Sequence, residues 1–303
     1  MLAVQAMRTR FEIVLADDRD PGALRAAGEE ALEEIVRVER ELSAFAPGSA
    51  LAQLNAWAAD RPVAVDGLML AFLRQTAALS ETLEGAFDPT VGALTALYRS
   101  NANDDALADA RRLVGFPRVV RIDEESATVS FAQQGVALDP GAIGKGWALD
   151  RAAQVLCDAG VHAALLHGGT SSVLAMGAPA GCEGWTVAVQ DPLVPEGRLA
   201  RVTLRDAALG VSAIYGRSYR RGDTRVGHVL DPRSGQPVDH TVLAAVVTRS
   251  ATEADAASTA LLVLGEAAIA RLGARLPGAS FLAARLHQEA LHLTATGALA
   301  ATA

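Results

Sequence analysis

Two oxygen-bearing side chains, Asp255 and Thr259, lie four residues apart in the segment Glu-Ala-Asp-Ala-Ala-Ser-Thr-Ala. On a helix this spacing places both side chains on one face, among small neighbours that favour a crowded site. A carboxylate and a hydroxyl can bind a hard cation such as Mg²⁺ when main-chain carbonyls, waters or substrate phosphates complete the oxygen shell. A helix cap near Thr252, with Asp255 in the first turn, explains the same residues nearly as well. The sequence leaves the metal site and the cap open as alternatives.

A glycine-rich turn at residues 138–146, Leu-Asp-Pro-Gly-Ala-Ile-Gly-Lys-Gly, leads into an apolar pattern with helical spacing. Such a turn presents free backbone N–H groups and the positive end of a helix dipole to an anion, and Lys145 adds a full charge. The turn is not a P-loop, because Lys145 follows no GxxxxG and precedes no Ser or Thr. The donor-rich loop at residues 167–172 is interpreted equally as a phosphate or sugar cradle and as a plain hairpin connection.

A histidine that can serve as a general base near neutral pH, His228, lies beside the turn Asp231-Pro232. A lone histidine is more often a packing residue, so the sequence does not decide its role. Apolar-Asp-Pro segments that continue to a glycine recur at residues 87–92, 138–144 and 230–235, and each alone is an ordinary turn sequence. No GxSxG, HExxH or GxGxxG motif occurs, so a triad hydrolase, a zincin and a Rossmann site are not supported.

Helices and strands in mixed order must position these residues. Apolar spacing of three and four predicts helices at residues 21–42, 66–83, 104–113, 146–159 and 252–264. Alternation and short apolar runs bounded by Gly, Pro and Asp predict strands at residues 11–15, 163–166, 172–176, 185–190, 200–204, 242–248, 280–285 and 290–294. This mixture indicates the α+β class.

Composition limits the classes of function. The 303 residues are 50% hydrophobic and 20% charged, a balance that buries a sizeable core and excludes disorder for most of the chain. The net charge of −8 gives no bulk positive field for nucleic acid or an anionic membrane, so any phosphate must be held locally. Cys157 and Cys182 show no metal-ligand or paired spacing and are interpreted as reduced.

The two ends of the chain carry separate expectations. The first twelve residues include charged side chains and no apolar h-region, and no run approaches the length of a membrane span. As the sequence stands we expect a cytoplasmic protein without membrane insertion, or an exported one if a leader was removed. We expect one domain over residues 1–298 and a disordered Ala/Thr tail at residues 299–303.

Taken in order, these segments resemble the ApbE-type flavin transferases, the FAD:protein FMN transferase family, over almost the whole chain. The motifs that carry the resemblance lie at residues 7–15, 39–45, 51–55, 85–94, 138–150, 168–177, 184–192, 228–238 and 254–265. Together, at intervals like those of the family, they are highly specific.

The resemblance implies an α+β fold of two T-fold-like halves in one compact unit, with mixed or antiparallel sheets covered by helices and FAD held between the halves. It implies an enzyme that uses Mg²⁺ beside the pyrophosphate of FAD and transfers FMN to a Ser or Thr hydroxyl of an acceptor flavoprotein, releasing AMP. No nucleic-acid partner is expected. Two alternatives stay open: an FAD pyrophosphate hydrolase that yields FMN and AMP, and a non-catalytic FAD-binding protein.

The resemblance also implies roles for single residues. It makes Asp255, Thr259 and the backbone carbonyl of Ala142 the metal ligands, and it makes Asp255 and His228 catalytic, with His228 as the base. The flavin-nucleotide contacts that it implies are Met7, Phe45, Ala86, Phe87, Asp88, Asp139, Lys145, His228 and Val229.

The chain departs from the family pattern at three places. Arg8 stands where Gly is common, Ala50 where an acidic residue is common, and residues 211–214, Val-Ser-Ala-Ile, where Thr-Ser-Gly is common. These departures concern the details of substrate entry.

Overall fold

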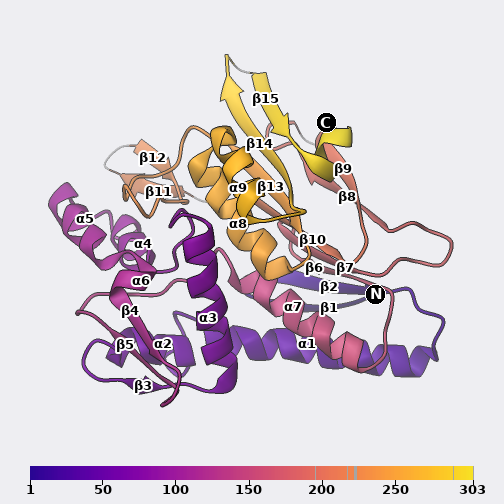
Figure 1. Cartoon of the computed structure of the whole chain (residues 1–303), viewed down its shortest axis with the longest axis horizontal. Coiled ribbons are helices and arrows are strands. Elements are labelled where there is room, and N and C mark those ends of the chain that lie inside the picture. Colours follow the sequence, from indigo (N-terminus) through magenta and orange to yellow (C-terminus); the bar gives the residue numbers. More distant parts are fainter. Residues whose placement is uncertain (195, 217, 222–223, 289, 303) are drawn as a thin grey trace.

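One eight-stranded antiparallel sheet forms the centre of the protein, in the order β1-β2-β6-β7-β10-β13-β14-β15 (Figure 1). The computed structural model describes residues 1–194, 196–216, 218–221, 224–288 and 290–302. The strands of the central sheet are β1 (Leu2–Ala6), β2 (Thr9–Leu15), β6 (Ala164–Gly168), β7 (Ser172–Met176), β10 (Ala207–Ala213), β13 (Leu243–Thr248), β14 (Ser280–His287) and β15 (Ala290–Ala295).

Two halves of like topology make up this sheet. The first half runs β1, β2, helix α1 (Pro21–Leu42), helix α7 (Gly144–Asp158), β6 and β7. The second half runs β10, β13, helix α8 (Ala251–Leu264), helix α9 (Ile269–Arg275), β14 and β15. The halves join where β7 pairs with β10, with Val173 opposite Leu209. The predicted α+β fold, with two like halves and an antiparallel sheet covered by helices, is confirmed.

The middle strands of the central sheet are covered on both faces, whereas β15 and the end of β14 are largely exposed. Helices α1, α7 and α8 cover one face (Figure 1), and the hairpin of β8 (Trp185–Gln190) and β9 (Arg198–Leu204) packs on the other. All six residues of β13 are buried as a result, which explains its unbroken apolar sequence. Helix α8 is buried over most of its length, and its small residues allow the sheet to approach its backbone.

A smaller lobe is inserted between α1 and α7, the purple region at the lower left of Figure 1. Its sheet has the order β3-β5-β4. The elements of the lobe are α2 (Ala50–Trp57), β3 (Val63–Ala64), α3 (Gly67–Thr82), α4 (Gly92–Arg99), α5 (Asp104–Ala110), the 3₁₀ turn η1 (Arg111–Leu113), α6 (Phe116–Val119), β4 (Val120–Asp123) and β5 (Thr128–Phe131). Residues 43–49, after α1, and 132–143, before α7, connect this lobe to the rest of the chain, and the turn at residues 85–90 lies within it between α3 and α4.

Three further elements complete the described chain: the hairpin of β11 (Ser218–Arg221) and β12 (Thr224–Gly227), the 3₁₀ turn η2 (Glu266–Ala268), and the terminal 3₁₀ helix η3 (Gly297–Thr302). Within the described residues, no single helix has the length and apolarity of a membrane span. Among these residues, only the helix pair Ala251–Leu264 and Glu266–Arg275, taken together, is long and apolar enough, and the two helices are bent by 118° at their junction.

The expectation of a disordered tail at residues 299–303 is wrong at its start. Leu299 is fully buried in the core on the β8–β9 side of the sheet, and the backbone N–H of Ala298 donates to Ser280 Oγ at 2.9 Å. Burial of an apolar side chain therefore holds this end on the sheet, although the composition resembles a frayed tail. Ala303 lies outside the described residues, and the single domain over residues 1–298 stays a prediction.

Gly210, on β10, lies where the central sheet packs directly against the backbone of α8. A Cβ at this position would lie 2.3 Å from Ala254 O, so we expect Gly210→Ala to lower the free energy of unfolding by about 1–3 kcal/mol, the usual cost of overpacking. Gly67→Ala is the control, because a Cβ there meets no atom within 4 Å. Urea unfolding measures both, and a Gly210→Ala variant as stable as the parent would contradict the packing.

Candidate functional site

The site is built where the N-terminal ends of α7 and α8 meet. Asp150, on α7, accepts hydrogen bonds from the N–H groups of Ala251 at 2.8 Å and Thr252 at 2.9 Å. A Cβ on Gly146 would lie only 2.1 Å from Ala251 O, so the glycine is required for this approach. The first turns of both helices are thereby held beside one another.

Asp255 lies at the centre of this junction and is only 5% exposed. Its Oδ2 accepts a hydrogen bond from the N–H of Gly146 at 2.8 Å, and its Oδ1 accepts one from Ser172 Oγ, on β7, at 2.7 Å. The Lys145 ammonium lies 3.8 Å from Oδ2. Burial raises the pKa of Asp255, while the charge of Lys145 and the two hydrogen bonds act in the opposite direction.

Helix capping does not explain Asp255. The N-cap of α8 is Ser250, whose side chain accepts from the N–H of Glu253, and Asp150 satisfies the next free N–H groups. The Asp255 carboxylate instead crosses to α7 and β7. The expected cap near Thr252 is present at Ser250, but Asp255 is the fifth residue of α8 and takes no part in it.

Hydroxyl groups surround the second predicted ligand, Thr259. Thr259 Oγ1 donates to the backbone carbonyl of Asp255 at 3.2 Å and lies 3.0 Å from Ser212 Oγ, on β10. Ser258 Oγ lies 2.8 Å from the same Ser212 hydroxyl. The Thr259 hydroxyl thus joins those of Ser212 and Ser258, and its bond to Asp255 is to the backbone carbonyl rather than to the carboxylate.

This donor set fits a hard cation. Among the described residues, no group of three or more His, Cys, Asp or Glu side chains is placed to hold a metal, so a cation here must use hydroxyl and carbonyl oxygens. Gly146 is the third residue of α7, so its N–H has no carbonyl acceptor within the helix and donates to Asp255. Ala142 directly precedes the N-cap of the same helix, Ile143. Carboxylate, hydroxyl and carbonyl oxygens are the ligands that Mg²⁺ takes in proteins.

A second group joins Phe45 to Asp139 through Arg99. The Phe45 ring is 67% exposed, and the Arg99 guanidinium carbon lies 5.1 Å from its centroid. Arg99 Nη2 is 3.7 Å from Asp139 Oδ2. The Asp139 backbone N–H donates to Pro89 O at 2.7 Å, so the two Asp-Pro turns lie side by side. An exposed aromatic face beside a guanidinium is a surface on which a planar ring can stack.

The turn at Ala86, Phe87 and Asp88 is buried. Asp88, 5% exposed, accepts from the N–H of Thr90 at 2.9 Å and of Phe116 at 2.7 Å. Burial raises the pKa of Asp88, against the hydrogen bonds from Thr90 and Phe116. Because Phe87 and Ala86 are each only 1% exposed, a ligand can meet them through the backbone rather than through their side chains.

Three remaining predicted contacts lie elsewhere on these elements. Met7 and Arg8 form the β1–β2 turn with φ of 50° and 62°, the turn type for which glycine is favoured. Met7 packs against the core beneath α1, and its N–H donates to Glu39 Oε1. His228 and Val229 are half-buried just after β12. Among the described hydrogen bonds, none joins Met7 or Val229 to Asp255.

The sequence singled out Ser172 only as part of the donor-rich loop at residues 167–172, and it did not indicate Ser212 or Arg99. Ser172 and Ser212 supply hydroxyls from neighbouring strands, and Arg99 links the aromatic face to Asp139. The only available signal was a serine within an otherwise apolar strand, where a buried hydroxyl needs a partner.

A profile of the ApbE family matches residues 7–282. This chain belongs to the ApbE family. The FAD:protein FMN transferase of Treponema pallidum is 33% identical over 87% of this chain and 78% of its own. The FAD:protein FMN transferase of Rhodobacter capsulatus is 35% identical over 79% of this chain but 47% of its own, so the chain spans about half the length of that relative. These relatives mark the chain as an enzyme of the transferase class.

Solved structures share the whole fold of this ApbE-family chain. The crystal structure of the ApbE protein from Thermotoga maritima has a TM-score of 0.86 at 26% identity, covering 99% of this chain and 98% of that one. The flavin transferase ApbE from Vibrio cholerae has a TM-score of 0.82 at 23% identity, covering 100% and 98%. The second likeness shows the fold alone.

The buried carboxyl of Asp88 predicts a pH effect on stability. Because the pKa of Asp88 is raised in the folded protein, its carboxyl stays protonated at pH values where the same carboxyl in the unfolded chain has ionised. The contribution of Asp88 to the free energy of unfolding therefore declines as pH rises above the ordinary pKa of 3.8. We therefore expect the free energy of unfolding of the parent, minus that of the Asp88→Asn variant, to fall as pH is raised above 3.8. Urea unfolding at stepped pH measures it, with Asp158→Asn controlling for one lost charge. A difference that grows with pH would contradict the assignment.

Proposed function

We propose that this chain transfers FMN from FAD to a Ser or Thr hydroxyl of an acceptor flavoprotein and releases AMP. Family membership supports the reaction class. The observation that carries the proposal is the buried Asp255 carboxylate, held by Gly146 and Ser172 at the junction of two helix N-termini with Thr259 and Lys145 beside it. A non-catalytic flavin carrier would not need a desolvated carboxylate at such a junction, because burial of that charge is costly.

Asp255, Thr259 and the Ala142 carbonyl would hold Mg²⁺, which when bound supplies charge neutralisation at the pyrophosphate. Lys145 is placed to contact a phosphate oxygen, since its ammonium lies at the first turn of α7, where the helix dipole also favours negative charge. Ser172 fixes one carboxylate oxygen of Asp255, and the Gly146 N–H fixes the other. The carboxylate is therefore oriented before any ligand arrives.

The remaining predicted contacts would bind the flavin nucleotide. Phe45, supported by Arg99, offers a stacking face, and Asp139 lies beside that guanidinium. The backbone of residues 86–88 would border the ligand, with Met7 and Val229 as apolar neighbours. Together these groups would bind FAD largely independently of the metal ligands.

His228 would act as the general base. In the proposed step its imidazole takes the proton from the acceptor hydroxyl, whose oxygen forms a bond to the FMN phosphorus. The pyrophosphate P–O bond breaks, and AMP leaves with the bridging oxygen and its electron pair. Neutral imidazole is required for proton uptake, so this step fails at acid pH.

Asp255→Ala tests the metal site. We expect FMN transfer in Mg²⁺ to fall by about 10² or more, the scale of losing a main electrostatic group, while FAD binding is retained. Asp158→Ala, which removes an exposed carboxylate from α7, is the control. Mass spectrometry of a Ser/Thr acceptor peptide measures transfer and fluorescence titration measures FAD affinity. Parental transfer by Asp255→Ala would refute the assignment.

His228→Ala tests the base. We expect transfer to drop by about 10² to 10⁴ with little change in FAD affinity, and parental transfer to decline as pH falls through the imidazole pKa. His162→Ala, an exposed histidine after α7, is the matched control. Single-turnover transfer is measured beside thermal melting. A His228→Ala protein that melts early but transfers at the parental rate would make His228 a structural residue.

A further inference from the structure

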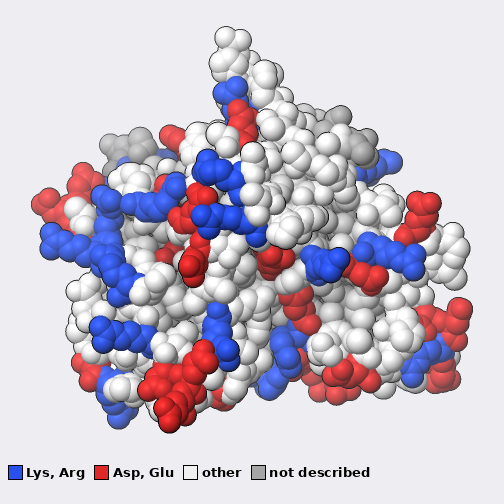
Figure 2. Space-filling view, in the orientation of Figure 1, with Lys and Arg blue, Asp and Glu red and all other residues white. Residues whose placement is uncertain are grey.

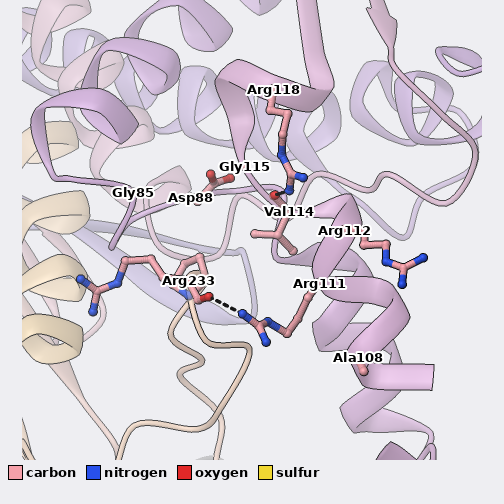
Figure 3. A pocket seen from close by; sticks show the side chains of 10 residues that line it. Gly85, Asp88, Ala108, Arg111, Arg112, Val114, Gly115, Arg118 and Arg233 are labelled. Carbon is pink, nitrogen blue, oxygen red and sulfur yellow. Dashed lines mark hydrogen bonds between the residues drawn. The ribbon is translucent and has the colours of Figure 1, made fainter. Parts of the chain in front are cut away.

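A pocket of about 500 Å³ opens between the small lobe and the loop that follows β12 (Figure 3). Four arginines line it: Arg111 and Arg112 from η1, Arg118 from α6, and Arg233 from the loop. The other lining residues are Gly85, Asp88, Ala108, Val114, Gly115 and Pro232. None of the four arginines belongs to the metal-ligand group or to the Phe45–Asp139 group.

Two of these guanidiniums carry charge that nearby carboxylates do not balance. Arg111 Nη2 donates to the backbone carbonyl of Arg233 at 3.0 Å, and Arg118 donates to the carbonyl of Val114 (Figure 3). Among the ion pairs of the described residues, neither arginine has a carboxylate partner. These bonds to neutral carbonyls fix the guanidiniums in place while leaving further N–H donors for an anion.

The acidic groups near the pocket are already engaged. Asp88 is buried and hydrogen-bonded to Thr90 and Phe116. Asp231 pairs with Arg233 at 2.9 Å, and Asp109 lies 3.8 Å from Arg112. The pocket therefore has a local excess of positive charge in a protein whose net charge is −8. Figure 2 shows Lys and Arg side chains gathered over this lobe, at the left of the molecule.

The loop that carries Arg233 connects the pocket rigidly to His228. Leu230 bridges to Pro237, the N–H of Val238 donates to Val229 O at 2.9 Å, and the N–H of Gly235 donates to Asp231 O at 2.7 Å. Tyr98 Oη donates to Gly235 O at 3.1 Å, which ties the loop to α4. One end of the braced hairpin thus holds the proposed base, and the other end holds Arg233, whose backbone carbonyl accepts from Arg111 of the lobe.

We propose that this pocket docks an acidic segment of the acceptor protein, an inference that rests on the proposed function. The acceptor hydroxyl must approach His228, and residues flanking it would reach Arg233 at the other end of the same loop and the lobe arginines that line the pocket with it. The four guanidiniums are mainly exposed around an open pocket, which suits carboxylates presented by an approaching protein surface. Guanidinium groups bind carboxylates in a bidentate manner, and this contact guides both encounter and register.

The double variant Arg111→Gln, Arg118→Gln tests the proposal. The probes are two rhodamine-labelled peptides of equal length, each with one Thr, flanked by Glu in one and by Gln in the other. We expect the double variant to bind the Glu peptide roughly tenfold more weakly than the parent does, and added salt to weaken parental binding. The control variant, Arg25→Gln with Arg121→Gln, removes two exposed arginines from α1 and β4 and should bind as the parent does. Fluorescence anisotropy gives the affinities.

Other outcomes would overturn the inference. Equal affinity of the parent and the double variant for the Glu peptide would remove the arginines from docking. Displacement of the Glu peptide by inorganic phosphate or AMP at matched concentration, or loss of FAD binding in the double variant, would assign the pocket to a small anion or to the nucleotide.

The proposed function is tested separately by the mass of the FMN adduct on each peptide. Equal adduct formation on the Glu and Gln peptides by the parent would overturn the docking inference and leave the transferase intact. No adduct on either peptide would contradict the transferase, and the docking inference with it.

Discussion

The rest of the site depends on one close approach, the contact of the α7 N-terminus with the α8 N-terminus at Gly146. No side chain fits there, because a Cβ would lie 2.1 Å from Ala251 O. The N–H of Gly146, in the first turn of α7, has no acceptor within the helix and donates to Asp255. The contact thus places a carboxylate, a lysine and two helix dipoles within one small volume. It also joins the two halves of the fold, since α7 belongs to the first and α8 to the second.

The Asp255 carboxylate at this contact is buried, which strengthens its electrostatic interactions but makes its ionised form less stable. A carboxylate that is 5% exposed is disfavoured as an ion, and its pKa is raised. Lys145, Ser172 and the Gly146 N–H offset part of that cost while fixing the direction of the oxygens. The exposed Phe45 face and the arginine pocket lie on the inserted lobe and its neighbouring loop, where partners have access.

Local signals in the sequence predicted the elements with strong patterns. Helix α1 runs over Pro21–Leu42 as expected, because Asp20 caps it and Pro21 starts it. Strand β10, Ala-Ala-Leu-Gly-Val-Ser-Ala, was not predicted. Its small residues have low strand propensity, and they are needed because α8 packs closely against this strand. Asp255 and Thr259 were found by spacing, but their partners on β7 and β10 come from distant parts of the chain. The arginine pocket was missed for the same reason, because residues 111–118 and 233 meet only in the folded protein.

Intact mass spectrometry of a Ser/Thr acceptor peptide distinguishes FMN transfer from FAD hydrolysis and from simple FAD binding. The peptide is incubated with the parent protein and FAD, once with Mg²⁺ and once with excess EDTA. We expect a covalent FMN adduct on the peptide and AMP in solution with Mg²⁺, and neither with EDTA. Release of free FMN with an unmodified peptide, or an adduct that forms equally in EDTA, would contradict this expectation.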